Sequence, residues 1–145
     1  MIKSSFNFTY PYHVRFECSR CTLCCGDTNT RTRHILLLTK ETEEISRTSS
    51  KAPRTFARRV IGHRPYAYEM KKDKEGKCVF LSQNRCIIYG VRPLICRCYP
   101  FELKPGKNGS HVFSATSECP GLGSGERLKE DYFNELFQLA REQLT

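Results

Sequence analysis

Cys18-Ser-Arg-Cys21-Thr-Leu-Cys24-Cys25 is a C-x-x-C-x-x-C-C run, and no other part of the sequence constrains the structure as strongly. Cysteines two residues apart can turn both sulfur atoms onto one soft cation, and nearby amides can hydrogen-bond to the sulfurs. Five more cysteines follow, which makes nine in 145 residues: Cys78, Cys86, Cys96, Cys98 and Cys119. This density of thiols indicates a metal-binding site.

Metal ligation is a better explanation of these cysteines than a disulfide framework. Residues 1–14 lack the apolar core of a secretory signal, and no run of about 18 apolar residues could span a membrane. We therefore expect a cytoplasmic protein, in which thiols stay reduced. The number of cysteines is odd, and adjacent Cys24 and Cys25 suit ligation better than two separate bridges.

The composition predicts one small domain, residues 1–145, with a lean apolar core. Hydrophobic residues make up 39% of the chain, and that share includes the cysteines. Without them about a third of the chain is apolar, which is below the average for globular domains. Small domains with little core need additional cross-links, and bound metal can supply them. We therefore expect a metal-stabilised domain.

Apolar patterns and chain breakers predict an α+β fold with short irregular strands, one hairpin and a C-terminal amphipathic helix. The C-terminal helix gives the clearest pattern, because apolar residues recur at helical spacing after a flexible lead-in from Gly121 to Gly125. Thr39 is expected to cap a short acidic helix. The other expected elements are an irregular or edge strand in 6–16, a buried strand in 33–38, a helix over 40–47, a hairpin of 78–81 with 85–89, a short helix opened by Pro93, and a strand over 111–115.

The first three cysteines of the run have the C-x2-C-x2-C spacing of bacterial-type ferredoxins. Those proteins take a further ligand from a distant Cys-Pro, a dipeptide that Cys119-Pro120 supplies here. One predicted centre is therefore an iron–sulfur cluster, with 4Fe–4S as the candidate type, held by Cys18, Cys21, Cys24 and Cys119. Zinc also accepts four thiolates, so Zn²⁺ stays open as the alternative.

A second predicted centre uses the remaining thiols. Cys25 would point away from Cys24 and join three later cysteines in a tetrahedral set: Cys78, Cys86 and Cys96. Cys98 is left out as a free or supporting thiol. The four histidines form no ligand pair with a cysteine and are expected on the surface or in the core. The number of metal sites, and how the eight ligands divide between them, stay open.

Taken in order, the cysteine motifs resemble the CxxCxxCC (YkgJ-type) cysteine-cluster family. The resemblance spans residues 16–125 and is carried by the run at 18–25, Cys78-Val-Phe-Leu, Cys86-Ile-Ile-Tyr-Gly-Val-Arg-Pro93 and Cys96-Arg-Cys-Tyr-Pro-Phe101. Members are described as zinc- or iron-chelating proteins and are often labelled iron–sulfur oxidoreductases. The family pattern carries over to Cys18, Cys21, Cys24, Cys25, Cys78, Cys86, Cys96 and Cys119, whereas Cys98 departs from it. Flagellin lysine N-methylases are relatives, but the name does not transfer their activity.

Three functions are compatible with these cysteines. The ferredoxin-like run suggests an iron–sulfur protein with a redox or electron-transfer role and an unknown redox or protein partner. The alternative is a structural zinc module that acts as a nucleic-acid or protein adaptor, because structural zinc contributes about 10–16 kcal/mol, comparable with the net stability of a domain. A protein related to lysine N-methylases is disfavoured. Whether the protein is an enzyme stays open, since no catalytic constellation supports a mechanism.

A basic strip lies between the cysteine groups. Its cations are Lys51, Arg54, Arg58, Arg59, Arg64, Lys71 and Lys72, and its interleaved aromatic residues are Phe56, Tyr66 and Tyr68. Such a strip can contact phosphates and stack bases. The formal net charge of +9 overstates the attraction for phosphate, because bound thiolates are negative. A solvated face, or cations that offset an anionic cluster, is favoured over a nucleic-acid contact.

Overall fold

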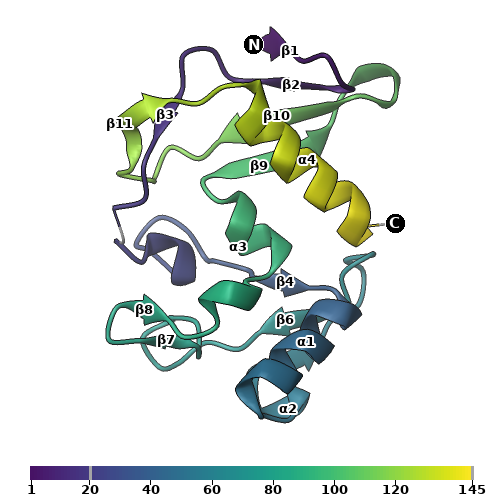
Figure 1. Cartoon of the computed structure of the whole chain (residues 1–145). Coiled ribbons are helices and arrows are strands. Elements are labelled where there is room, and N and C mark those ends of the chain that lie inside the picture. The colour runs from purple at the N-terminus through teal and green to yellow at the C-terminus, as the bar shows by residue number, and fades with distance from the viewer. Residues whose placement is uncertain (20, 145) are drawn as a thin grey trace. The chain divides into compact units, whose positions relative to one another are not determined.

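The chain divides by its internal contacts into two units, one of which is built from both ends of the sequence (Figure 1). The computed structural model describes every residue except Arg20 and Thr145. Unit 1 comprises Met1–Cys21 and Cys98–Thr145, and unit 2 comprises Thr22–Arg97. That residues 1–145 act as one domain stays a prediction.

Unit 1 is a small mixed sheet covered by one long helix. Its strands are β1 (Ile2–Lys3), β2 (Phe8–Tyr10), β9 (Phe101–Pro105) and β10 (His111–Ala115), in the order β1-β2-β10-β9. β10 pairs antiparallel with β9 and parallel with β2. The helix, α4 (Glu130–Leu144), buries its apolar face on this sheet (Figure 1).

The core of unit 1 is almost entirely aromatic. Phe8, Phe113, Phe133 and Phe137 are each at most 4% exposed. Ring centroids lie 4.8 Å apart between Phe8 and Phe137 and 5.3 Å apart between Phe113 and Phe133, within the range of favourable aromatic contacts. Helix and sheet therefore share one continuous apolar cluster.

A second ribbon in unit 1 pairs β3 (Arg15–Phe16) with β11 (Leu122–Arg127). The predicted flexible lead-in at Gly121–Gly125 is therefore wrong, because most of this segment is strand. A side chain at Gly121 would press its Cβ against the Glu17 carbonyl oxygen, so only glycine allows this approach.

Unit 2 contains a three-stranded antiparallel sheet with two helices packed beside it. The sheet order is β4 (Leu36–Leu37), β6 (Tyr68–Met70) and β5 (Ala57–Arg59), and the helices are α1 (Thr39–Ser49) and α2 (Pro53–Phe56). Leu37, Ile45, Phe56 and Phe80 are at most 1% exposed and form the centre of its core. Cysteines join this core, since Cys78 lies inside it and Cys25, Cys86 and Cys96 pack against it.

The rest of unit 2 is short elements that carry cysteines. A hairpin of β7 (Leu81–Ser82) and β8 (Arg85–Cys86) turns through Gln83 and Asn84, both left-handed at φ 50° and 62°. The remaining helical elements are equally short, each with one or two turns. They are the 3-10 turns η1 (Leu23–Cys25) and η2 (Tyr89–Val91) and the helix α3 (Leu94–Cys98). A further 3-10 turn, η3 (Lys107–Gly109), lies in unit 1.

The buried carboxylate of Glu41 ties two helix starts together. Its Oε1 accepts the amide of Leu38 at 2.9 Å, at the start of α1, and its Oε2 accepts the amide of Leu94 at 2.6 Å, at the start of α3. Both amides lack partners within their own helices, and a carboxylate offsets the positive end of a helix dipole. Glu41 therefore fixes α3, which carries Cys96, against α1.

The predicted α+β class, hairpin, short helix at Pro93, 111–115 strand and C-terminal helix are confirmed. One local prediction is wrong, because Leu38, not Thr39, precedes α1, and Glu41 supplies the cap instead of a hydroxyl. The predicted irregular or edge strand in 6–16 is confirmed in part: β3 is an edge strand, whereas β2 is an inner strand between β1 and β10. No helix in the described part of the chain is long and apolar enough to cross a membrane.

Candidate metal centre

The turn η1 presents two adjacent sulfur atoms at the spacing of two ligands of one ion. Cys24 Sγ and Cys25 Sγ lie 3.8 Å apart. A metal–sulfur bond of about 2.3 Å places two sulfurs of a tetrahedral ion about 3.8 Å from each other. Thr22, left-handed at φ 66°, starts this turn, and the Cys25 amide closes it on the Thr22 carbonyl at 3.0 Å.

Cys78 is brought to this pair by a close approach of two backbone segments. The Cys78 amide donates to the Cys25 carbonyl at 2.6 Å, and the Asp27 amide donates to the Gly76 carbonyl at 2.9 Å. A Cβ at Gly26 would lie 2.5 Å from the Gly76 carbonyl oxygen, so glycine is required between them. Cys78 therefore lies next to Cys25 in the fold, although it comes 52 positions after Gly26 in the sequence.

The pKa values of the thiols indicate that four sulfurs of unit 2 oppose one another's ionisation. Burial raises the pKa of Cys78 to about 11, and the charges of Cys86 and Cys24 add to this rise. Burial likewise raises the pKa of Cys96 to about 12, with contributions from Cys78, Cys24 and Cys86. Thiolates that oppose each other's ionisation in this way can ionise together only around a cation.

The pKa values of the two thiols of η1 are shifted in opposite directions. The hydrogen bond between the two thiols, in which either sulfur can be the donor, lowers the pKa of Cys24 and raises that of Cys25. Arg33 and Arg92 also lower the pKa of Cys24, although burial opposes them. One thiolate and one thiol, hydrogen-bonded to each other, is the arrangement expected of this pair before a metal ion replaces the proton.

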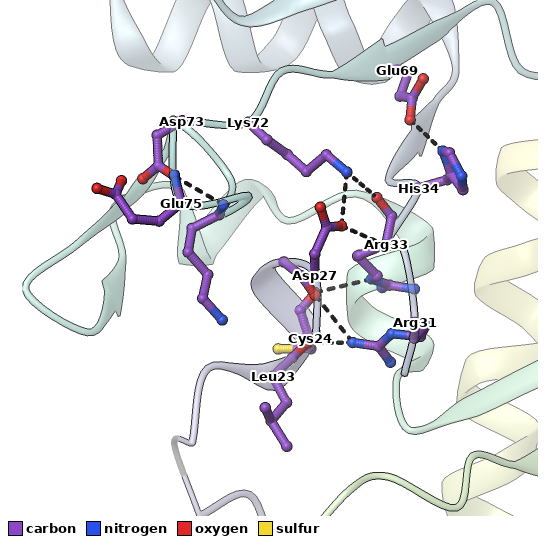
Figure 2. Close-up of polar contacts among 12 residues, drawn as sticks. Leu23, Cys24, Asp27, Arg31, Arg33, His34, Glu69, Lys72, Asp73 and Glu75 are labelled. Atoms are coloured by element: carbon purple, nitrogen blue, oxygen red, sulfur yellow. Dashed lines mark hydrogen bonds and ion pairs between the residues drawn. The ribbon is translucent and has the colours of Figure 1, made fainter. Parts of the chain in front are cut away.

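Two arginines absent from the predicted site hold η1 in place (Figure 2). Arg31 Nη2 donates to the carbonyls of Leu23 at 2.6 Å and Gly26 at 3.2 Å. Arg33 Nε donates to the Cys24 carbonyl at 3.0 Å. Their spacing in the sequence carries no signal of this role, because only the folded turn brings those carbonyls within reach.

A lysine and an aspartate extend this network to the sheet (Figure 2). Asp27 Oδ1 accepts from the Arg33 amide at 2.7 Å and from Lys72 Nζ at 2.8 Å, and Lys72 Nζ also donates to the Arg33 carbonyl at 3.1 Å. The Lys72 hydrogen bond is the largest cause of the lowered pKa of Asp27. Lys72, one cation of the basic strip, is thus part of the framework that supports the thiols.

Unit 1 holds a separate group of thiols. Burial raises the pKa of Cys119, and the charges of Cys21 and Cys18 raise it further. Cys98 is buried in the same unit. The predicted ferredoxin-like set combines Cys18, Cys21 and Cys119 with Cys24 of unit 2, and it stays a prediction.

The second predicted set, Cys25, Cys78, Cys86 and Cys96, lies wholly in unit 2, where Cys24 joins it. No three His, Cys, Asp or Glu side chains of the described residues already surround a point where an ion could sit. The fit to a metal therefore rests on the donor atoms and on the Cys24–Cys25 spacing. Both suit zinc or iron, which thiolates prefer to hard cations.

The buried carboxylate of Glu69, on β6, contacts the exposed side chains of His34 and Arg58 and gives a pH-dependent prediction. Its side chain is 7% exposed, and its oxygens lie 2.6 Å from His34 Nδ1 and 2.7 Å from Arg58 Nη2. Burial acts to raise the pKa of Glu69, but the hydrogen bonds of His34 and Arg58 outweigh it, and the pKa is lowered. The lowered pKa means that Glu69 stabilises the fold above the ordinary glutamate pKa and loses this effect as the pH falls.

We expect Glu69→Gln to lower the free energy of unfolding by about 1–2 kcal/mol at pH 7. The difference from the unsubstituted protein should shrink as the pH falls below about 5, because protonation of Glu69 then removes the same charge that the substitution removes. Urea unfolding at several pH values measures this difference in the free energy of unfolding. Glu43→Gln, on the exposed side of α1, is the matched control and should change stability by less than about 0.5 kcal/mol throughout. A pH-independent difference would contradict the prediction.

Comparison with known proteins identifies the chain through its cysteines. No curated protein and no solved structure matches it. The family model CxxCxxCC, described as a "putative zinc- or iron-chelating domain", matches residues 17–127, which include all eight predicted ligands. The predicted cofactor, zinc or an iron–sulfur cluster, agrees with that description. The match covers most of the sequence, and the chain therefore belongs to the CxxCxxCC family.

Proposed function

We propose that the thiols of unit 2 hold one tetrahedral zinc or iron ion whose main role is to stabilise the fold. The observation that carries this proposal is the 3.8 Å between Cys24 Sγ and Cys25 Sγ. In a 4Fe–4S cluster each thiolate binds a different iron atom, so the ligand sulfurs lie farther apart than on one ion. The spacing therefore favours a mononuclear centre over a 4Fe–4S cluster in this unit.

The remaining ligands would come from Cys78, Cys86 and Cys96, of which two complete a four-coordinate site. Cys86 and Cys96 lie on short elements, β8 and α3, and Cys78 lies in an isolated bridge with Lys72, so few hydrogen bonds of regular structure hold these residues. A structural zinc ion contributes about 10–16 kcal/mol, which is comparable with the whole net stability of a small domain. A bound ion would cross-link η1, β8 and α3.

The chain's own charges support such a centre. Arg33 acts on the thiols of Cys24 and Cys96, and Arg92 acts on those of Cys24 and Cys86, in each case favouring the thiolate. A four-thiolate site with a divalent ion is anionic, so these guanidinium groups would offset its charge. Arg31 holds the backbone of η1 and would keep Cys24 and Cys25 on one side of the turn.

Metal and sulfide analysis of anaerobically purified protein tests this proposal. The difference in metal and sulfide content between the unsubstituted chain and C24S/C25S gives the content of the site in unit 2. We expect that difference to be about one zinc or iron ion and no acid-labile sulfide. Loss of acid-labile sulfide together with iron would show a cluster instead. A folded, reduced, unsubstituted chain without transition metal would overturn both.

A redox iron–sulfur centre is the second candidate function, and the cysteines of unit 1 favour it. Cys18, Cys21 and Cys119 influence each other electrostatically, and Cys119-Pro120 is the dipeptide that ferredoxin-type sites use. A reducing compartment such as the cytoplasm would keep the thiols available. Reversible bleaching of a visible absorption band by dithionite, lost in C18S/C21S, would support this role. Colourless protein that contains only zinc would exclude it.

A further inference from the structure

One continuous part of unit 2 carries positive charge only. Between Ile45 and Tyr68 the sequence has no aspartate or glutamate, whereas six residues are basic. All six are exposed: Arg47, Lys51, Arg54, Arg58, Arg59 and Arg64. They lie along the end of α1, α2, β5 and the loop to β6, elements that contact one another in the fold. We call these six residues the cationic face.

The structure separates this face from the rest of the predicted basic strip. Lys72 is bound to Asp27, and Phe56 is 1% exposed, so neither can meet a ligand. Lys71 Nζ donates to the Arg54 carbonyl at 2.6 Å and leaves the Arg54 guanidinium unaffected. Arg58 is paired with Glu69, yet 67% of its side chain remains exposed.

The cationic face does not balance the charge of the thiols. The cations that lower thiol pKa values are Arg33 and Arg92, and both lie outside the face. Arg54, Arg59 and Arg64 form no ion pair within the described part of the chain. These three positive charges therefore have no carboxylate partner among the described residues, which is typical of a surface that meets a polyanion.

Apolar and planar side chains lie among the residues of the cationic face. Ile61, in the loop between β5 and β6, is 97% exposed. The Arg59 guanidinium lies 5.7 Å from the centre of the Tyr68 ring and forms a cation–π pair with it. Hydrogen bonds from Val60 N to Ala67 O and from Tyr66 N to His63 O, at 3.0 and 2.8 Å, shape the loop. Such groups pack against unpaired bases, which a duplex keeps stacked inside.

We propose that the cationic face binds single-stranded nucleic acid. Arg54, Arg59 and Arg64 contact phosphates, and Ile61 packs against a base. This binding requires unit 2 to be folded but does not depend on whether its metal is zinc or iron. An anionic membrane would also attract Arg and Ile side chains, but a single exposed isoleucine offers little surface to insert.

The test is fluorescence anisotropy with a 12-nucleotide oligo(U) over a range of salt concentrations. R54Q/R59Q/R64Q should bind about 100-fold more weakly at 0.1 M salt, with a salt slope smaller by about 2, because each lost phosphate contact removes about 0.7 from it. The matched control K3Q/K104Q/K107Q removes the same charge from exposed positions of unit 1 and should change affinity less than about 3-fold. Circular dichroism and metal content verify that both triple variants are folded.

Two further measurements distinguish single-stranded nucleic acid from a duplex and from an anionic membrane. Ile61→Ser should weaken oligo(U) binding about 5-fold and leave binding to a 12-base-pair duplex unchanged, since only unpaired bases reach this side chain. Equal losses in the two triple variants, or no oligo(U) binding by the unsubstituted chain at 100 µM, would overturn the proposal. Tighter binding to phosphatidylserine vesicles than to oligo(U), lost in Ile61→Ser, would assign the face to a membrane instead.

Discussion

Replacing both Cys24 and Cys25 by serine is expected to release the metal ion of unit 2 and to unfold this unit at 25 °C. Only three thiols, Cys78, Cys86 and Cys96, would then remain, and three cannot complete a four-thiolate site. The lost coordination, about 10–16 kcal/mol, is at least as large as the net stability of a small domain. Elemental analysis and thermal unfolding followed by circular dichroism measure the two effects.

Single substitutions provide the controls for this result. Five sulfurs serve a site that needs four, so Cys24→Ser or Cys25→Ser alone should weaken metal affinity less than the double change. Cys98→Ser should leave the metal of unit 2 in place, because Cys98 belongs to unit 1. If C24S/C25S kept its full metal content and melting temperature, the assignment of η1 to the metal centre would be wrong.

The cysteine run indicates a metal site from sequence alone, but its division between the units is a property of the fold. The boundary falls between Cys21 and Thr22, and the left-handed Thr22 begins the turn that carries Cys24 and Cys25. Residue spacing cannot reveal such a boundary, because C-x-x-C-x-x-C is continuous in the sequence. The prediction that Cys25 points away from Cys24 is also wrong, since their sulfurs are in contact at 3.8 Å.

Elements with strong periodic patterns could be predicted, and those fixed by distant contacts could not. α4 follows from apolar residues at helical spacing over 15 residues. β11 contains Gly123 and Gly125 and has no strand pattern, and it exists because it pairs with β3. Arg31 and Arg33 also give no signal in the sequence. Their role depends on carbonyl groups that become acceptors only when η1 has formed.

Removal of bound metal by a chelator is expected to abolish amide-exchange protection in unit 2 while unit 1 keeps most of its own. The two apolar cores differ in composition. That of unit 2 contains Cys78, with Cys25, Cys86 and Cys96 packed against it, so releasing the ion leaves thiolates at the edge of the core that repel one another until they take up protons. The aromatic cluster of unit 1, as described, includes no cysteine, although Cys98 is also buried in this unit.

Hydrogen–deuterium exchange with mass spectrometry tests this difference peptide by peptide. Amides of β4, β6 and α1 should exchange about 1,000-fold faster after chelation, which corresponds to a loss of about 4 kcal/mol of local stability. Amides of β9, β10 and α4 should change less than about 10-fold, because Phe113 and Phe133 stay buried without metal. Cys18 and Cys21 are exposed, so a metal ion lost there disturbs only the nearby chain. Equal loss of protection in both units would mean that the ions of the two units stabilise a single cooperative core.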